Sequence, residues 1–189
     1  MSGDMLDPLR TFVRGMAAVV EQPADEPTVL AEGTRLLIDL VATDGWLPDS
    51  HAAPDPDRYR QYLLYRDPAA RFSVVSFVWG PGQRTPIHDH TVWGLIGMLR
   101  GAEIAEGYAQ GAEGLRVTDR VRLDVGQVDA VSPAIGDLHQ VSNAYDDRVS
   151  ISIHVYGADI GTVRRATYDP AGNPRPFVSG YASTPALTL

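Results

Sequence analysis

The sequence of 189 residues contains no cysteine and no lysine. Without cysteine there are no disulfide bonds and no thiolate ligands, so any metal site must be built from histidine or carboxylate side chains. All 16 basic residues are scattered arginines and the formal net charge is −8, which argues against a surface for nucleic acid or an anionic membrane. No uninterrupted stretch approaches about 18 apolar residues, so no membrane-spanning segment is expected. We expect a soluble cytoplasmic protein whose partners include neither nucleic acid nor membrane; the oligomeric state stays open.

The length and the 44% apolar content are enough for one domain with a full core, and we expect a single domain over residues 1–189. The first 45 or so residues show apolar side chains at helical spacing. Asp7 is a candidate N-cap with Pro8 at the first helical position, and a second helix is expected after Asp25 or Glu26 and Pro27. Both helices are expected to pack on the rest of the domain.

From about Tyr59 onward, apolar residues recur with a period of two, which is typical of β-strands. The expected strands are separated by Gly, Pro, Asp and Asn: Tyr59–Tyr65, Arg71–Trp79, Trp93–Leu99, Ala102–Ala109, Leu115–Leu123, Gln127–Val131, His139–Asn143, Val149–Tyr156 and Thr162–Tyr168. Such spacing predicts an antiparallel jelly-roll sandwich or barrel over about residues 59–168. The tail, residues 169–189, is rich in Pro and Gly and is expected to wrap the surface.

The stretch with the clearest chemical pattern holds His88, Asp89 and His90. On a β-strand, successive side chains point to opposite faces, so both histidines would share one face and Asp89 would point away. Two imidazoles on one face can chelate a metal ion, and a third ligand must come from elsewhere. The other histidines are His51, His139 and His154.

A second pattern lies in the strand expected at Val149–Tyr156. Ser152, His154 and Tyr156 share one face of this strand, which can look into the barrel. A hydroxyl, an imidazole and a phenol at this spacing can form a hydrogen-bonded relay, in which Ser152 orients His154 and His154 orients Tyr156 or shares a proton with it.

Two glycine and histidine spacings resemble the signatures of the cupin superfamily. The first consists of Gly82, His88, His90, Gly94 and Gly101, with Gly94 standing where many metal cupins carry a glutamate ligand. The second consists of Gly126, Pro133, Gly136, His139 and Asn143. The resemblance implies His139 as the third ligand, and therefore three neutral imidazoles and no protein carboxylate.

The Ser-His-Tyr arrangement is similar to the triad of the cysteine dioxygenase family of thiol dioxygenases, and the match covers Tyr59 to Tyr168. The resemblance implies a mainly β fold, a cupin jelly-roll (double-stranded β-helix) barrel with N-terminal helices. It also implies Fe(II) as cofactor and O2 as cosubstrate, with a thiol oxidised to a sulfinic acid. Three neutral ligands leave the ion its full charge, which acidifies an incoming thiol. Tyr156 would hydrogen-bond the oxygen or the substrate, and it cannot carry a thioether crosslink because the chain has no cysteine.

The family divides into enzymes for cysteine and enzymes for 3-mercaptopropionate. Animal-type cysteine enzymes bind the substrate carboxylate with an arginine on the strand that enters the barrel, and Gln61 stands at or near this position here. The chain thus resembles the bacterial glutamine-type branch, in which a later arginine can bind the carboxylate. Arg165 is the candidate, with Arg164 expected on the other face.

We therefore expect an iron thiol dioxygenase for a small thiol substrate, with 3-mercaptopropionate favoured over L-cysteine. The alternatives are an L-cysteine dioxygenase, another cupin oxygenase with a carbon substrate, and a non-catalytic metal-binding cupin. His51 is expected in a solvated loop, whereas Phe77, Trp79 and Trp93 are expected in the core.

Overall fold

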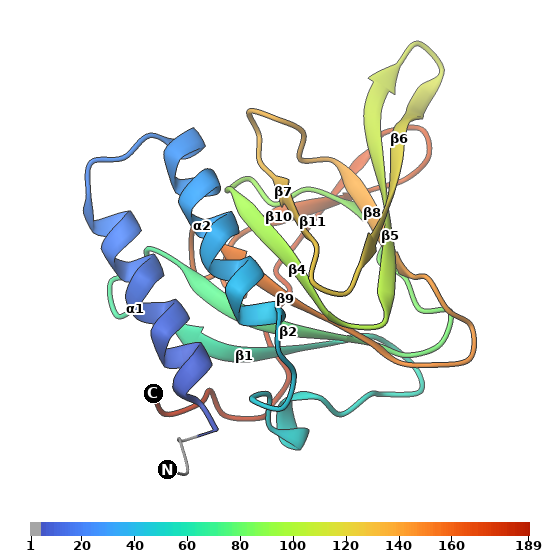
Figure 1. The fold of residues 1–189 in the computed structure, drawn as a ribbon. Helices are drawn as coiled ribbons and strands as arrows, with labels where there is room; N and C mark the ends of the chain where they lie inside the picture. Colours follow the sequence, from blue (N-terminus) through green and yellow to red (C-terminus); the bar gives the residue numbers. More distant parts are fainter. Residues whose placement is uncertain (1–4) are drawn as a thin grey trace.

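A computed structural model describes residues 5–189 of the chain (Figure 1). Its helical elements are α1 (Asp7–Glu21), α2 (Glu26–Val41) and a short 3-10 turn, η1 (Asp49–His51). The strands follow in the order β1 (Arg60–Arg66), β2 (Ser73–Trp79), β3 (Ile87–His88), β4 (Gly94–Arg100), β5 (Ala102–Gly111), β6 (Gly114–Asp124), β7 (Val128–Val131), β8 (His139–Asn143), β9 (Ser150–Tyr156), β10 (Arg165–Tyr168) and β11 (Pro174–Phe177).

Both helices predicted from the sequence are present. The side chain of Asp25 caps α2 by accepting a hydrogen bond from the Thr28 amide at 3.0 Å. The prediction of Asp7 as the N-cap of the first helix is wrong by one residue, because Leu6 is the N-cap and Asp7 begins α1, with Pro8 in its first turn. Proline fits there because the first amides of a helix have no intrahelical acceptor.

The strands form two antiparallel sheets. The five-stranded sheet has the order β1-β2-β9-β4-β7, and the six-stranded sheet has the order β11-β10-β3-β8-β5-β6. Chain neighbours are often not sheet neighbours, as when β9 inserts between β2 and β4. This confirms the mainly β, double-stranded β-helix fold with two N-terminal helices.

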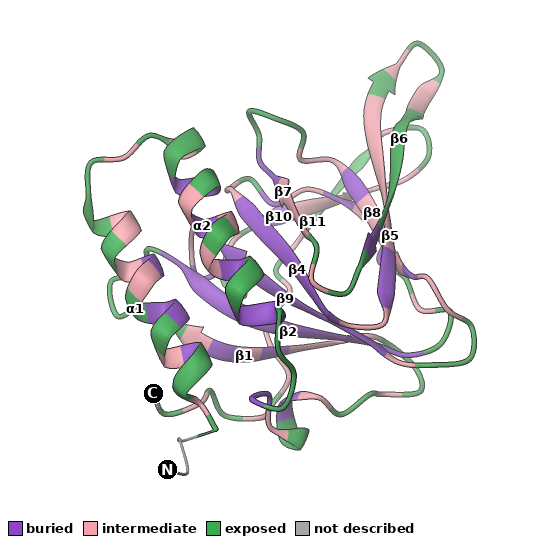
Figure 2. Cartoon of the chain, viewed as in Figure 1, coloured by how far each residue is buried: buried purple, intermediate pink, exposed green. Residues whose placement is uncertain are grey.

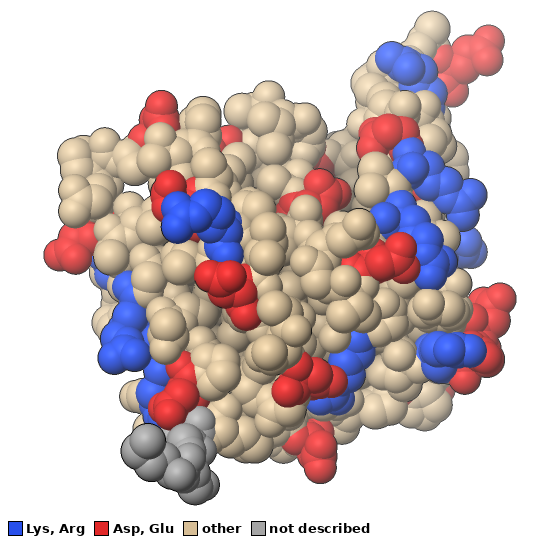
Figure 3. Space-filling model, in the orientation of Figure 1, with Lys and Arg blue, Asp and Glu red and all other residues tan. Residues whose placement is uncertain are grey.

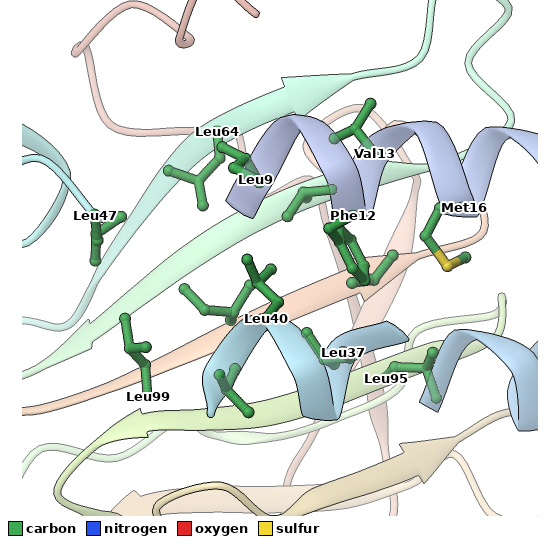
Figure 4. Close-up of a cluster of buried hydrophobic side chains, with 14 of the residues drawn as sticks. Leu9, Phe12, Val13, Met16, Leu37, Leu40, Leu47, Leu64, Leu95 and Leu99 are labelled. Carbon is green, nitrogen blue, oxygen red and sulfur yellow. The ribbon is translucent and has the colours of Figure 1, made fainter. Parts of the chain in front are cut away.

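The helices cover the outer face of the five-stranded sheet (Figure 1). Leu9, Phe12 and Met16 of α1 and Leu37 and Leu40 of α2 are buried in one cluster with the outward side chains of that sheet (Figure 4). The contact is close at Gly97 of β4, where a Cβ atom would lie 2.8 Å from Cγ of Leu37. Apolar burial against the sheet therefore holds the helices in place.

Burial differs sharply between the sheets (Figure 2). Every residue of β2 and β9 is buried, whereas most of β6 is exposed at the edge of the six-stranded sheet. Figure 3 shows arginine and acidic side chains interspersed over one face of the molecule.

None of the helices between residues 5 and 189 combines the length and the apolar character that crossing a membrane requires.

The tail contains a strand that the sequence did not predict. β11 pairs with β10, with Arg165 opposite Phe177. Further along, the amide of Ala182 donates to the carbonyl oxygen of Gln61 at 2.8 Å, so the tail also runs beside β1. The prediction of a solvated His51 is wrong, because this side chain is buried and its Nε2 lies 3.0 Å from the carbonyl oxygen of Pro185.

Candidate metal centre and active site

The structure brings His88, His90 and His139 together inside the barrel. His88 and His139 are cross-strand partners on β3 and β8, and one ring nitrogen from each of the three residues lies within 4.8 Å of the others. All three side chains are buried. The three histidines that the sequence patterns selected therefore form one cluster, whereas His51 and His154 lie outside it.

The local reason for this grouping differs from the expected one. β3 ends at His88, so strand alternation does not place His90. Instead, the Asp137 carboxylate accepts hydrogen bonds from the amide of His90 at 2.9 Å and from that of Thr91 at 2.8 Å. Thr91 has a φ of 61°, a left-handed conformation that turns the chain after His90. Asp137, which the sequence analysis did not select, therefore holds this turn in place.

Hydrogen bonds also fix which ring nitrogens face the centre. Nδ1 of His88 lies 3.1 Å from the carbonyl oxygen of Pro86, and Nδ1 of His90 lies 2.9 Å from Oδ1 of Asp137. Because both acceptors need a proton on Nδ1, each Nε2 keeps a lone pair for a metal ion. Burial lowers the pKa of His88 to about 4 and the pKa values of His90 and His139 well below their usual range. Three neutral imidazoles fit a first-row transition metal ion.

Asp89 points away from the histidine cluster, as the sequence analysis expected, although it lies just beyond the end of β3. Its carboxylate accepts hydrogen bonds from the Tyr168 hydroxyl at 2.7 Å and from the Ala166 amide at 2.8 Å. Asp89 thereby ties the histidine segment to β10, the strand on which Arg165 lies.

The side chains of Ser152, His154 and Tyr156 form the relay that their spacing predicted. The Ser152 hydroxyl lies 2.8 Å from Nε2 of His154, and Nδ1 of His154 lies 2.8 Å from the Tyr156 hydroxyl. Burial lowers the pKa of His154 to about 3 and raises the pKa of Tyr156 above its usual range. The imidazole is therefore neutral and the phenol is protonated near neutral pH.

Aromatic neighbours hold the relay in position. Phe77 stacks on the His154 ring with centroids 4.0 Å apart, and Nε1 of Trp79 donates a hydrogen bond to Ser152 at 3.1 Å. At the other end, the Tyr156 ring stacks on His90 at 5.3 Å. Phe77 and Trp79 are buried as predicted, and both also contact the relay.

Gly94 lies directly across from Tyr156 on the neighbouring strand. A Cβ atom at Gly94 would lie 3.0 Å from two carbons of the Tyr156 ring. A side chain at Gly94 would therefore crowd the Tyr156 ring, which would have to shift by a few tenths of an ångström.

A cavity of about 180 Å³ opens beside this cluster. It is lined by Tyr59, Gln61, Phe77, Thr85, Pro86, His88, Tyr156, Arg165, Thr167 and Phe177. The structure therefore brings both predicted substrate-binding residues, Gln61 and Arg165, to one cavity with a predicted metal ligand and the relay tyrosine.

Arg165 is only 6% exposed, whereas Arg164 is exposed, in line with the prediction. The Arg165 guanidinium donates a hydrogen bond to the Ser179 hydroxyl at 2.8 Å, and it lies 4.7 Å from the centroid of the Phe177 ring. Nε of Arg165 is buried without a hydrogen-bond partner, as is Oε1 of Gln61. Among residues 5–189, no carboxylate pairs with Arg165.

The tail supplies cavity residues that the sequence analysis missed. Phe177 lines the cavity, and Ser179 holds the Arg165 guanidinium. Tyr181 donates to Oδ1 of Asp159 at 2.6 Å and accepts from the Gly161 amide, which fastens the tail to the segment between β9 and β10. No local sequence pattern marks these residues, because they reach the cavity only through the pairing of β11 with β10.

Together, the double-stranded β-helix, the three-histidine cluster and the buried relay define a cupin with a candidate metal centre. A comparison with protein families narrows this class. The model of the family "Cysteine dioxygenase type I" matches residues 34–169, well over half of the chain. The chain belongs to this family, and its membership points to an iron-dependent thiol dioxygenase of the cupin superfamily.

Solved structures with the same fold are distant in sequence. A protein with a double-stranded β-helix domain from Klebsiella pneumoniae is 21% identical over 58% of this chain and 85% of that chain, with a TM-score of 0.43. An RmlC-like cupin from Desulfovibrio desulfuricans is 21% identical over 56% of this chain and 89% of that chain, with a TM-score of 0.42. At these identities the likeness concerns the fold alone.

Proposed function

We propose that the chain adds both atoms of O2 to the sulfur of a small thiol carboxylate to give a sulfinic acid, with 3-mercaptopropionate as the preferred substrate. In this proposal Fe(II) is held by His88, His90 and His139. When bound, the iron supplies a Lewis acid for the thiol and the redox chemistry that O2 requires. Family membership and the neutral three-imidazole donor set support this assignment.

The observation that carries the substrate class is the buried guanidinium of Arg165, which shares a cavity with His88 and Tyr156. A buried cation without a carboxylate partner is costly, and an incoming carboxylate would pair with it through charge-assisted hydrogen bonds. A carboxylate bound at Arg165 would direct the other end of a short substrate toward His88. Charge and position therefore support a carboxylate-binding role for Arg165, with Gln61 lining the same cavity.

The preference for 3-mercaptopropionate over L-cysteine rests on the charges of the same lining. Arg165 is the one formally charged side chain among the lining residues, and none of them is an aspartate or glutamate. The ammonium group of L-cysteine would lose its hydration there without gaining an anionic partner, which disfavours binding. A substrate with one carboxylate, one thiol and no amine fits the cavity better.

Tyr156 would contact the reacting groups directly, because it lines the cavity and also stacks on His90. His154 and Ser152 lie behind it and fix the position of its hydroxyl. We propose that the three residues control a hydrogen bond to the substrate or to oxygen.

The test is anaerobic reconstitution with Fe(II), followed by parallel measurement of oxygen uptake and sulfinate formation with 3-mercaptopropionate, L-cysteine and cysteamine. The proposal expects the highest kcat/KM with 3-mercaptopropionate and the lowest with cysteamine, which has no carboxylate. A preference for L-cysteine would contradict the assignment of the carboxylate and amine sites. The absence of sulfinate from all three thiols would refute the thiol dioxygenase proposal and leave a metal-binding cupin with another task.

A further inference from the structure

The guanidinium of Arg165 is held in place by a neutral residue of the tail. The Ser179 hydroxyl accepts a hydrogen bond from Nη2 of Arg165 at 2.8 Å, and it is the only hydrogen-bond acceptor for this guanidinium among residues 5–189. A guanidinium has five N–H groups, so the others, including the buried Nε–H, remain for a ligand. Ser179 therefore fixes the position of the cation without neutralising it.

Other arginines of the chain use Nε and Nη2 together to bind a carboxylate. Nε and Nη2 of Arg71 donate to Asp67 at 2.9 and 2.7 Å, and the same two nitrogens of Arg100 donate to Asp44 at 2.6 and 2.8 Å. In Arg165, by contrast, Nη2 donates to a hydroxyl and Nε has no partner. A carboxylate side chain in place of this hydroxyl would pair with the guanidinium and cancel its charge.

The backbone is anchored on both sides of Ser179. Before it, β11 pairs with β10, and Phe177 lies opposite Arg165. After it, the amide of Gly180 donates to the carbonyl oxygen of Gly161 at 3.0 Å. The hydroxyl is thus presented to the guanidinium by a segment that backbone hydrogen bonds hold in place.

Ser179 lies outside the cavity of about 180 Å³ beside the histidine cluster. It lines a second cavity of about 370 Å³, and Tyr59, Gln61 and Phe177 line both cavities. Arg165 lines the smaller cavity, whereas Ser179 does not. An effect of Ser179 on a substrate in the smaller cavity must therefore pass through Arg165.

We propose that Ser179 is a positioning residue that makes this cavity selective for anionic thiols, because it orients Arg165 and leaves the positive charge for the substrate. A substrate carboxylate then accepts charge-assisted hydrogen bonds from Nε and from the remaining N–H groups. An amine in the same place meets an unneutralised cation and is repelled. The inference rests on the proposed function, since it concerns the carboxylate site of that function.

The test is calorimetric titration of the full-length, Fe(II)-reconstituted protein with 3-mercaptopropionate and with cysteamine, under anaerobic conditions so that no thiol is oxidised. Ser179→Asp places a carboxylate against Arg165. The affinity for 3-mercaptopropionate should fall at least about 100-fold, because the guanidinium is already paired. The affinity for cysteamine should rise, because a neutralised arginine no longer repels its ammonium group. An equal change for both thiols would overturn the inference.

Two milder variants test the hydrogen bond itself. Ser179→Ala removes the bond without adding a charge, so it should weaken 3-mercaptopropionate binding about 5-fold and leave cysteamine binding unchanged. Ser179→Thr keeps a hydroxyl and should bind both thiols as the wild-type protein does. With O2 admitted, Ser179→Ala should raise KM for 3-mercaptopropionate and leave kcat close to the wild-type value. Unchanged affinity in Ser179→Ala, or a loss that Ser179→Thr shares, would overturn the inference even if Ser179→Asp failed to fold.

Ser183→Asp is the matched control, because Ser183 is exposed on the same tail and receives the same change of charge. This variant should bind both thiols with wild-type affinity. A fall in 3-mercaptopropionate affinity as large as that of Ser179→Asp would assign the effect to the charge of the tail and overturn the role of Ser179.

Binding without O2 separates this inference from the proposed function. The expected binding pattern in a protein that forms no sulfinate once O2 is admitted would leave the inference standing and the proposed function refuted. Sulfinate formation together with thiol affinities that do not respond to Ser179 would refute the inference alone. If the wild-type protein bound no 3-mercaptopropionate, the inference would be overturned whatever the sulfinate assay showed.

Discussion

The two faces of β9 are equally buried and chemically opposite. Ile151, Ile153 and Val155 pack with the helices on the outer face, whereas Ser152, His154 and Tyr156 face the barrel interior. Every residue of this strand is buried. Burial alone therefore does not determine what a strand position can hold.

The difference lies in what each face requires of its neighbours. The outer face needs apolar side chains of matching shape, which α1 and α2 supply. The inner face needs a partner for every polar atom, because an unsatisfied buried group costs about 1–3 kcal/mol. The relay meets this need through hydrogen bonds between its own members and one from Trp79 to Ser152. We expect substitutions on the inner face to change the reaction rate and substitutions on the outer face to change the free energy of unfolding.

The largest effect is expected at the histidine cluster. His90→Ala should lower kcat/KM with 3-mercaptopropionate by at least about 1000-fold, because a metal ion contributes several kcal/mol to the reaction. Metal content per chain, measured after reconstitution, should fall in parallel while circular dichroism shows a retained fold. His51→Ala is the matched control, since His51 is buried outside the cluster, and it should keep the metal. Equal metal loss in both variants would contradict the assignment.

On the outer face, Ile153→Ala should cost about 3 kcal/mol of unfolding free energy, because it leaves a cavity beneath the helices. Denaturant unfolding measures this loss. The kcat of the folded fraction should stay close to that of the wild-type protein. A large fall in kcat would show that the two faces are not independent.

The third effect is a pH dependence of stability that depends on Glu103. Its pKa of about 7 in the fold lies above the ordinary 4.5, so the folded state binds the proton more tightly than the unfolded state. The associated stability is complete below about pH 4.5 and is lost as the pH rises through about 7. Between about pH 5 and pH 8, the wild-type unfolding free energy should fall relative to Glu103→Gln by up to about 3 kcal/mol. Urea unfolding of both proteins at the two pH values tests this, and parallel pH dependences would refute it.

A smaller effect is expected at the cavity. Arg165→Lys keeps the charge but loses the planar fork that binds a carboxylate through two hydrogen bonds, so KM for 3-mercaptopropionate should rise about 30-fold, or about 2 kcal/mol. Arg164→Lys is the control on the exposed neighbour and should leave KM unchanged. A similar KM in both variants would remove Arg165 from the substrate site.

The smallest effect compares two tyrosine hydroxyls. Tyr156→Phe should lower kcat about 10-fold, or about 1.4 kcal/mol, because one hydrogen bond at the reacting groups is lost. Tyr62 belongs to the outer core cluster and its hydroxyl donates to the Ala53 carbonyl. Tyr62→Phe should cost about 1 kcal/mol of stability without changing kcat. An unchanged kcat in Tyr156→Phe would show that its hydroxyl takes no part in the reaction.

The sequence by itself determined the features that depend on local spacing. Alternation along β9 placed Ser152, His154 and Tyr156 on one face, and apolar spacing predicted both helices, because these periods follow directly from strand and helix geometry. Signature resemblance selected His88, His90 and His139, which the structure brings together.

Only the tertiary structure decided what lies between these patterns. Asp137 turns His90 toward the cluster across a long sequence separation, the tail brings Ser179 to Arg165, and His51 is buried by Pro185. Nothing in the local sequence singles out Glu103, whose pKa is raised because the folded barrel buries its carboxyl group. These contacts join residues far apart in the chain. Their energies depend on burial and on the hydrogen-bond partners available. They therefore exist only once the two sheets have closed around the site.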